Sequence, residues 1–355
     1  MFRFFTLCAI LALSTLSADA AYITFNATTN EYTDLESMLP TLLEKSIAGW
    51  NNIIKETQDS ITFTQSTNLK NYCNIDYTIS AGTKIKGLQV FVQFIETAST
   101  SIATTEICAF SKQDGYYFPR IGLITMDVSK SEEWSKRVLD NVMEHEIGHI
   151  LGLGTLWNSY GYVSNGAYGG SNGVYGYEQV GASDGVESVP VQRSQSSDLF
   201  HWDDRVLGGE LMTGRMNGHF QPMSSVTVEA LKDLGYQVWP NNADSFSLDE
   251  NTYKNDTYDV WIDLYHDYTP LGTTAKIPLF SSGKLAYSTV TFSSASSSSS
   301  SSGSSSGVTN NYYYGDSRMH PSAWEISVTA LLAVFAVALF GTCGMCLYRR
   351  RFMNQ

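Results

Sequence analysis

A serine tract from Ser293 to Ser306, interrupted only by Ala295 and Gly303, limits the part of this 355-residue chain that can fold. A segment with almost no apolar side chains cannot form a core, and it behaves as a flexible stalk. We therefore assign residues 292–323 to a stalk. One folded body is expected at residues 21–291, which is long enough to bury a sizeable core.

The first residues of the chain have the pattern of a targeting segment. Arg3 supplies a positive charge, an apolar stretch runs from Phe4 to Leu13, and Ala18-Asp19-Ala20 has the small-x-small form of a cleavage site. We predict a signal peptide at residues 1–20, in preference to a buried N-terminal helix. The folded body is then expected to be exported.

A second targeting pattern lies near the other end. The run from Ile326 to Leu347 contains no charged residue and is long enough to cross a bilayer as a helix, and Arg349 to Arg351 follow it. This predicts a transmembrane helix at residues 324–348 and a cytoplasmic tail at residues 349–355. The protein would be a single-pass type I membrane protein with an extracellular or luminal body, by default at the cell surface. A lipid anchor is the alternative, but its signal normally ends in the apolar run itself.

Two cysteines remain in the exported body, Cys73 and Cys108, because the other three fall in the signal peptide or the membrane segment. In an oxidising compartment, such a pair most simply forms one disulfide. Asn26 and Asn255 each begin an N-x-Thr sequon, and they are predicted to carry N-glycans.

Hydrophobic periodicity divides the body into a helix, a sheet and further helices, which predicts an α+β fold. Helical spacing of apolar residues is found over Leu35–Lys55, Glu132–Leu151 and Ser225–Leu234. Short apolar or alternating runs predict strands at Ile61–Thr64, Ile75–Ile79, Leu88–Ile95 and Ile121–Val128. The Gly-, Ser-, Asn- and Tyr-rich stretch from Gly152 to Leu199 is expected to be a long irregular connection, and loops of this length are often functional.

The second predicted helix carries the sequence His145-Glu146-Ile147-Gly148-His149. Residues four apart share one face of a helix, so both imidazoles can reach one metal ion, and zinc is the ion that this H-E-x-x-H motif usually binds. Glu146 is one step round the helix, where its carboxylate can take a proton from water at the metal's open position. Gly152 follows as a helix stop. The alternative, an unrelated pair of surface histidines, fits poorly with the apolar character of the helix.

A catalytic zinc site needs a third protein ligand. The compact form of the motif places a histidine six residues after the second one, where this chain has Thr155. From the residues alone, His201 and His219 are the realistic candidates, with Glu178 or Glu210 as carboxylate alternatives.

The order of these segments resembles the leishmanolysin-like zinc metallopeptidases of the metzincin clan. The resemblance covers about Phe25 to Leu248, and it is carried by the motif helix with Gly152, a long insert, His201-Trp202, Glu210-Leu211-Met212-Thr213-Gly214 and Val226 to Tyr236.

This resemblance implies a metzincin-like domain with a twisted mixed sheet, an active-site helix, a long insert before the third ligand and a C-terminal helix after the Met-turn. It also implies that His201 is the third zinc ligand and Met212 the Met-turn methionine. The chain departs from the family in having only two body cysteines, no cysteine-bearing pro-segment and a membrane helix. The resemblance therefore does not explain how the enzyme would be kept inactive before it is needed.

Together these features predict a zinc metalloendopeptidase with one catalytic Zn²⁺. It would hydrolyse extracellular or surface proteins and peptides by a zinc-activated water, with Glu146 as general base. A formal net charge of −13 disfavours nucleic acid as a partner, and the bilayer is contacted through one helix. The alternatives are a non-catalytic adhesion glycoprotein on the same scaffold and a zinc hydrolase with a non-protein substrate.

Overall fold

The computed structural model describes residues 22–27, 33–55, 57–96, 102–129, 136–192, 200–216, 220–248, 262–263 and 271–293. All of them belong to one compact unit, Met1–Ser300. The predicted signal peptide, transmembrane helix and tail, the stalk after Ser293 and the sequon residue Asn255 lie outside the described residues. Within the described residues, no helix combines the length and apolar character needed to span a membrane. Asn26 lies in a strand, and its side chain is not described.

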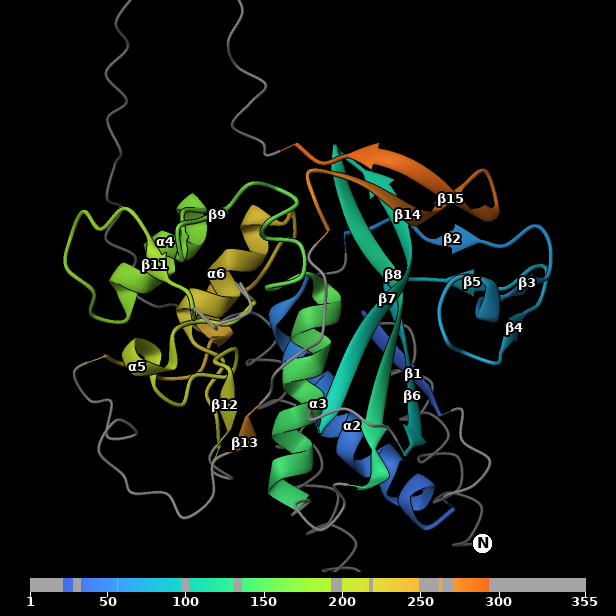
Figure 1. Cartoon of the computed structure of the whole chain (residues 1–355), viewed down its shortest axis with the longest axis horizontal. Helices are drawn as coiled ribbons and strands as arrows, with labels where there is room; N and C mark the ends of the chain where they lie inside the picture. The colour runs from blue at the N-terminus through green and yellow to red at the C-terminus, as the bar shows by residue number, and fades with distance from the viewer. Residues whose placement is uncertain are drawn as a thin grey trace, which may run out of the picture. The chain divides into compact units, whose positions relative to one another are not determined.

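A six-stranded mixed sheet forms one side of this unit, with the strand order β1-β6-β8-β7-β14-β15 (Figure 1). β1, β6 and β8 run parallel, β7 is antiparallel to β8, and β14 pairs in parallel with β7 and antiparallel with β15. The strands are β1 Ile23–Ala27, β6 Leu88–Ile95, β7 Ala103–Gln113, β8 Tyr116–Asp127, β14 Thr274–Ser281 and β15 Lys284–Thr291.

Two tight hairpins contain three of the four sheet strands that were not expected from the sequence. Asp114 and Gly115 connect β7 to β8, and Ser282 and Gly283 connect β14 to β15, all with positive φ. Two such residues in succession form the turn that matches the twist of antiparallel strands. The sequence-based prediction missed β1, β7, β14 and β15. The chain therefore returns to the sheet after its last predicted helix.

Two helices, α2 (Thr33–Ile53) and α3 (Lys136–Leu151), pack together and against the sheet. The indole Nε1 of Trp50 on α2 donates to the carbonyl oxygen of Glu144 on α3 at 2.8 Å. Strand β6 alternates as a half-covered strand should, with one set of side chains in the core shared with both helices: Leu88, Val90, Val92 and Phe94. The intervening Phe91 belongs to a second core. Both helices were predicted from the sequence, α3 with a start four residues early.

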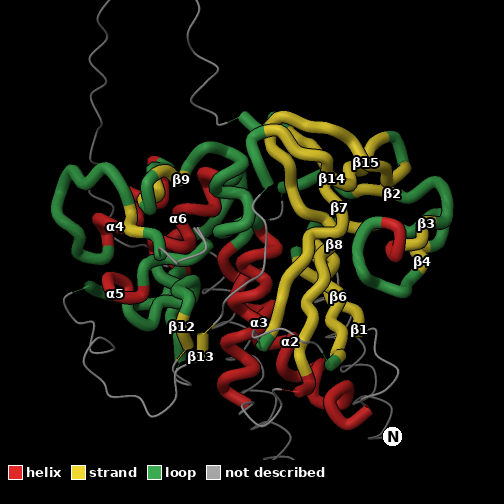
Figure 2. The backbone as a smooth tube through the Cα atoms, in the orientation of Figure 1, coloured by secondary structure: helices red, strands yellow, loops and turns green. Residues whose placement is uncertain are grey.

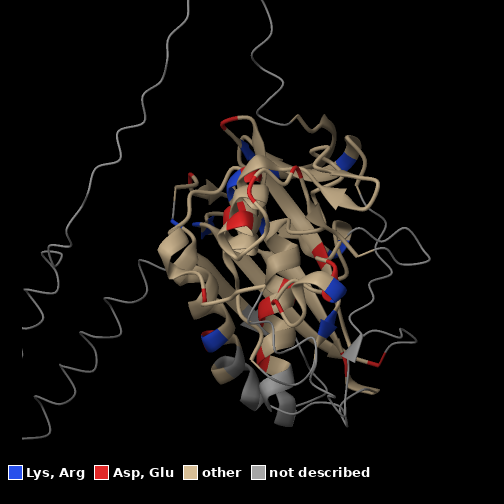
Figure 3. Cartoon of the chain, turned by 90° about the vertical axis from the view of Figure 1, so that its left-hand side faces the viewer, with Lys and Arg blue, Asp and Glu red and all other residues tan. Residues whose placement is uncertain are grey.

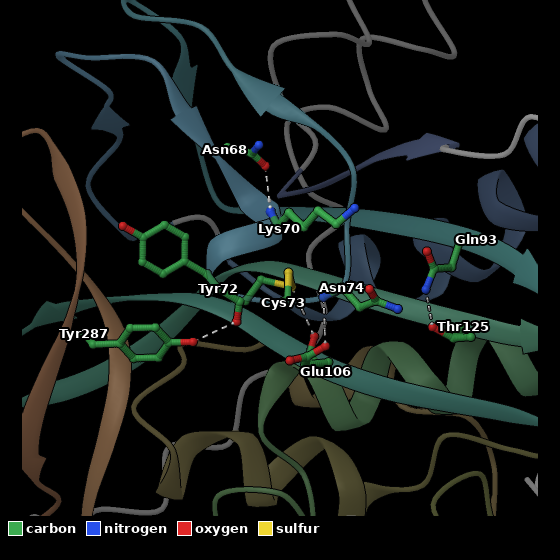
Figure 4. The surroundings of a disulfide bond; sticks show 10 residues. Asn68, Lys70, Tyr72, Cys73, Asn74, Gln93, Glu106, Thr125 and Tyr287 are labelled. Atoms are coloured by element: carbon green, nitrogen blue, oxygen red, sulfur yellow. Dashed lines mark hydrogen bonds between the residues drawn. A yellow bond between two sulfur atoms is a disulfide. The ribbon is translucent and has the colours of Figure 1, made fainter.

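The second core lies between the sheet and a small lobe, residues 61–85. The lobe consists of two-residue strands and one 3₁₀ turn, namely β2 Ile61–Thr62, β3 Thr67–Asn68, η1 Leu69–Asn71, β4 Thr78–Ile79 and β5 Lys84–Ile85. A disulfide joins Cys73 of the lobe to Cys108 of β7, the two cysteines that the sequence pairs (Figure 4). Two of the predicted strands are thus shorter than expected, because the lobe is held by the disulfide and its core rather than by long ladders.

Beyond α3 the chain forms a second half, on the side of that helix away from the sheet (Figure 2). Its elements are β9 Val163–Ser164, β10 Ala167–Tyr168, α4 Ser171–Gln179, β11 Val189–Pro190, α5 Asp204–Leu207, β12 Arg215–Met216, α6 Ser225–Asp233, η3 Pro240–Asn242 and β13 Ile262–Asp263. The prediction of an irregular connection at residues 152–199 is wrong in its middle, because α4 is a helix fastened to α6. The carboxylate of Asp233 accepts the backbone N–H groups of Asn172 and Gly173, at 3.1 and 3.0 Å, in the first turn of α4.

Charged residues are sparse and of mixed sign among the uncharged ones (Figure 3). Arg120 on β8 is a buried exception, with 1% exposure. Its guanidinium donates to the carbonyl oxygens of Gly87, Asp59 and Ile85 at 2.7, 2.8 and 3.1 Å. Burial lowers the pKa of Arg120. Its hydrogen-bond partners are all acceptors, which stabilise the buried cation. These bonds connect β8 to the segments just before and just after the lobe and to its last strand, β5.

Candidate metal centre

Three buried histidines converge in the described part of the chain. His145 and His149 lie on one face of α3, and His201 lies in the second half, shortly before α5. Their Nε2 atoms are 2.9 Å (His145–His149), 3.1 Å (His149–His201) and 3.2 Å (His145–His201) apart. The side chains are 0%, 1% and 5% exposed respectively. The sequence proposed all three as ligands, and the fold brings them together.

The hydrogen bonds of the first two rings define which nitrogen is available. His145 Nδ1 lies 2.6 Å from the carbonyl oxygen of Leu211, and His149 Nδ1 lies 2.8 Å from that of Leu153. A carbonyl can only accept, so each Nδ1 carries the hydrogen and each Nε2 carries a lone pair. Metal-binding histidines are commonly oriented in this way.

This arrangement fits a cation at the centre. Two Nε2 lone pairs at 2.9 Å repel each other unless a positive charge lies between them. Ligand bonds of about 2.0–2.1 Å in a tetrahedral site place neighbouring nitrogens roughly 3.3 Å apart, close to the spacing found here. The buried group could therefore bind a metal ion.

His201 reaches the helix through a short ladder and a close backbone contact. Trp202 bridges Val191 on one side and Thr213 on the other, and the N–H of Gln192 donates to the carbonyl of His201 at 2.9 Å. A Cβ on Gly154, which has φ +75, would lie 2.1 Å from the carbonyl oxygen of Phe200. The glycine allows the backbone next to His201 to cross the end of α3.

Met212 occupies the turn that follows this ladder. Its side chain is fully buried against α3, and its carbonyl accepts the N–H of Trp202 at 3.0 Å. The turn of Leu211, Met212 and Thr213 therefore lies directly beneath the histidines, since its first residue supplies the carbonyl bonded to His145.

Glu146 is fully buried and is held by a residue of the sheet. The Thr105 hydroxyl on β7 donates to Glu146 Oε2. Burial raises the pKa of Glu146, while the neighbouring His149 and the hydrogen bond from Thr105 lower it. A carboxylate with a raised pKa near the imidazole of His149 can accept a proton more readily than an ordinary exposed one.

Thr155, which stands where the compact motif has a histidine, and the two alternative carboxylate ligands have other roles. Thr155 donates its hydroxyl to the carbonyl of His149 at 2.7 Å, which satisfies an acceptor at the end of α3. Glu178 accepts the N–H of Gly185 at 2.9 Å, and Glu210 is bonded within the turn and α6. In the described residues the metal-ligand cluster consists of the three histidines. His219 lies outside those residues.

Sequence reasoning missed most of the groups that support the centre. The carbonyls of Leu153 and Leu211 carry no sequence signal, because every residue has a carbonyl. Thr105 was missed together with its strand. The Asp114-Gly115 dipeptide is a hairpin signal that would have revealed β7 and, with it, a strand beside the motif helix.

No model of a known protein family matches the sequence, and a search of curated proteins finds no match. The resemblance to leishmanolysin-like peptidases therefore rests on the motif residues alone.

Proposed function

We propose that the chain is a zinc-dependent endopeptidase with a metzincin-like fold of the leishmanolysin-like type. The observation that carries this is the convergence of His145, His149 and His201, with Glu146 buried beside them. Three neutral imidazoles with the fourth position left for water or substrate are a ligand set typical of catalytic rather than structural zinc sites. Imidazoles also suit copper, nickel and iron, so metal analysis is part of the test.

The three histidines would hold the ion through Nε2, and the carbonyls of Leu153 and Leu211 fix the orientation of His149 and His145. When bound, Zn²⁺ supplies Lewis acidity, which lowers the pKa of water toward ~7 and polarises the scissile carbonyl.

Glu146 moves the proton in this proposal. Its carboxylate takes a proton from the attacking water and returns it to the nitrogen of the leaving amine. The Thr105 hydroxyl orients Oε2, so the carboxylate is positioned by the sheet rather than by α3 alone.

The proposal also places this centre outside the cytoplasm, on a body tethered by the helix at residues 324–348. Its sequence support is the signal pattern, the uncharged run and the arginines after it. The disulfide between Cys73 and Cys108 is independent support, because such bonds persist mainly in oxidising compartments.

The test uses the 355-residue chain purified in mild detergent, with metal content measured and a peptide library digested. We expect one zinc per chain and cleavage that a chelator abolishes. Glu146→Ala should keep the zinc and lose cleavage, whereas His201→Ala should lose zinc and His219→Ala should retain it. A zinc-loaded chain that cleaves no peptide favours an adhesion protein or a hydrolase of another substrate class.

A further inference from the structure

Glu210 is a carboxylate with no exposure and with four hydrogen bonds to its oxygens. Oε2 accepts the N–H of Met212 at 2.6 Å. Oε1 accepts the N–H of Ser224 at 3.1 Å, its hydroxyl at 2.9 Å and the hydroxyl of Thr227 at 2.6 Å. All four donors are neutral groups. Three of them, from Ser224 and Thr227, lie at the start of α6, where the helix dipole favours a negative charge.

One of these bonds connects Glu210 to a ligand histidine through a single peptide group. The carbonyl of Leu211 and the N–H of Met212 belong to the same peptide unit. His145 Nδ1 donates to that carbonyl at 2.6 Å, and the N–H at the other end of the unit donates to Glu210. Hydrogen bonds in series polarise one another, so the carboxylate strengthens the carbonyl as an acceptor. A stronger acceptor at Nδ1 makes Nε2 a better metal ligand.

A second route leads from Glu210 toward His201. The Thr227 hydroxyl that donates to Glu210 also accepts the indole N–H of Trp202 at 2.9 Å. The backbone N–H of Trp202 donates to the carbonyl of Met212 at 3.0 Å, which is itself anchored by Glu210. Trp202 directly follows His201 in the chain. Its indole is bonded to Thr227 and its backbone N–H to Met212, and both of these residues donate a hydrogen bond to Glu210.

We propose that Glu210 is a positioning residue of the metal centre, which sets the orientation and basicity of His145 through the Leu211–Met212 peptide and holds the segment of His201 through Thr227 and Trp202. It touches neither substrate nor metal. The inference rests on the proposed metal centre, but it does not depend on which substrate the centre acts on.

The decisive experiment measures metal affinity instead of activity alone. The full chain, freed of metal, is titrated with Zn²⁺ in competition with a chromophoric chelator, and separately with Co²⁺ while its visible spectrum is recorded. Glu210→Gln keeps the size of the side chain but turns an N–H donor toward the N–H of Met212. Glu178→Gln is the matched control, because that carboxylate also accepts a backbone N–H, from Gly185, outside the metal-ligand cluster.

We expect the zinc dissociation constant of Glu210→Gln to rise about 10- to 100-fold, the usual effect of losing a support of a metal ligand. The Co²⁺ spectrum should shift, while both readouts stay at wild-type values in Glu178→Gln. A folded Glu210→Gln chain with wild-type zinc affinity and an unchanged Co²⁺ spectrum would overturn the proposal, as would an equal loss in the control.

A second variant covers the case in which Glu210→Gln does not fold. Thr227→Val keeps the shape of the side chain but removes the hydroxyl shared by Glu210 and Trp202, so a smaller loss of zinc affinity is expected. Wild-type affinity in folded Thr227→Val would then count against the inference. If the wild-type chain itself binds no metal, the proposed function fails instead, and the two failures are distinguishable.

Discussion

The sulfur of Met212 lies against the backbone of Gly148: a Cβ added to that glycine would be 2.5 Å from Sδ and 3.0 Å from Cε of the methionine. Gly148 is on α3, between the two histidines that the helix supplies. A hydrogen at this position therefore lets the turn beneath the centre approach the helix closely. The ring of Trp50 closes the same space from α2, with Cζ2 3.0 Å from the added Cβ.

We expect Gly148→Ala to lower the free energy of unfolding of the metal-free chain by about 1–3 kcal/mol, because extra volume in a packed interior forces its neighbours apart. Zinc affinity should fall as well, since the displaced groups support the histidines. Urea denaturation with and without zinc measures both effects. The double variant Gly148→Ala/Met212→Ala should lose less free energy of unfolding than the two single variants lose in total, because the shorter side chain at position 212 relieves the overlap. Strict additivity would show that the two residues do not share this space.

Glu210 predicts a pH dependence of stability. Burial raises its pKa from 4.5 to about 7, against the opposing effect of bonds from Thr227, Met212 and Ser224. The folded chain therefore holds a proton that the unfolded chain releases between these values, so this group's contribution to stability falls as pH rises from about 4.5 to about 7 and is level above that. The total change is on the order of 3 kcal/mol.

The measurement compares metal-free wild type with Glu210→Gln, which cannot titrate at this position. The difference between their free energies of unfolding should decline over that pH range and then stay constant. A difference that is flat or that grows with pH would mean that the folded-state pKa of Glu210 is not raised.

Zinc removal should destabilise the chain by an amount that grows with the logarithm of its affinity. The Nε2 atoms of His145 and His149 lie 2.9 Å apart, so their lone pairs repel each other unless a cation lies between them. The unfolded chain does not bring these atoms together, so it binds the cation more weakly. With free zinc at about a thousand times its dissociation constant, the free energy of unfolding should rise by about 4 kcal/mol. Affinity should decrease toward acidic pH, because protons compete for Nε2. Denaturation with zinc or with a chelator tests this, and His201→Ala should remove most of the difference.

The parts of the centre that depend on local geometry could be predicted from the sequence. The spacing of His145 and His149 fixes a shared helix face, and Gly152 marks the end of that helix, so α3 lies within the predicted range. Strand β6 was predicted with its observed bounds because six of its eight residues, LQVFVQFI, are apolar. His201 could be chosen over His219 only by resemblance, since spacing alone left both open.

The remaining parts depend on contacts between distant segments. After Ala103, strand β7 continues through the partly exposed residues Thr104, Thr105 and Glu106, and a register irregularity near Ala109 breaks its alternation. β14 finds its partner β7 far back along the chain, which no local pattern encodes. From the sequence alone, Glu210 was only an alternative to the histidine ligands, because it is a carboxylate. Its burial against α6 and its bond to the turn become visible only in the folded chain.

The disulfide is the last feature with a measurable consequence. Cys73 and Cys108 are 35 residues apart in sequence, and closing a loop of this length reduces the conformational freedom of the unfolded chain. On the chain-entropy model, the stabilisation is about 3–4 kcal/mol. Replacing both cysteines by serine should lower the free energy of unfolding by this amount, as measured by urea denaturation under oxidising conditions. Adding a reductant should destabilise the wild type and leave the double variant unchanged. Because the bond fastens the lobe to β7, the strand that carries Thr105, loss of the bond should also reduce activity more than zinc content. A fractional loss of activity equal to the fractional loss of bound zinc would instead show that the disulfide acts through the three histidines.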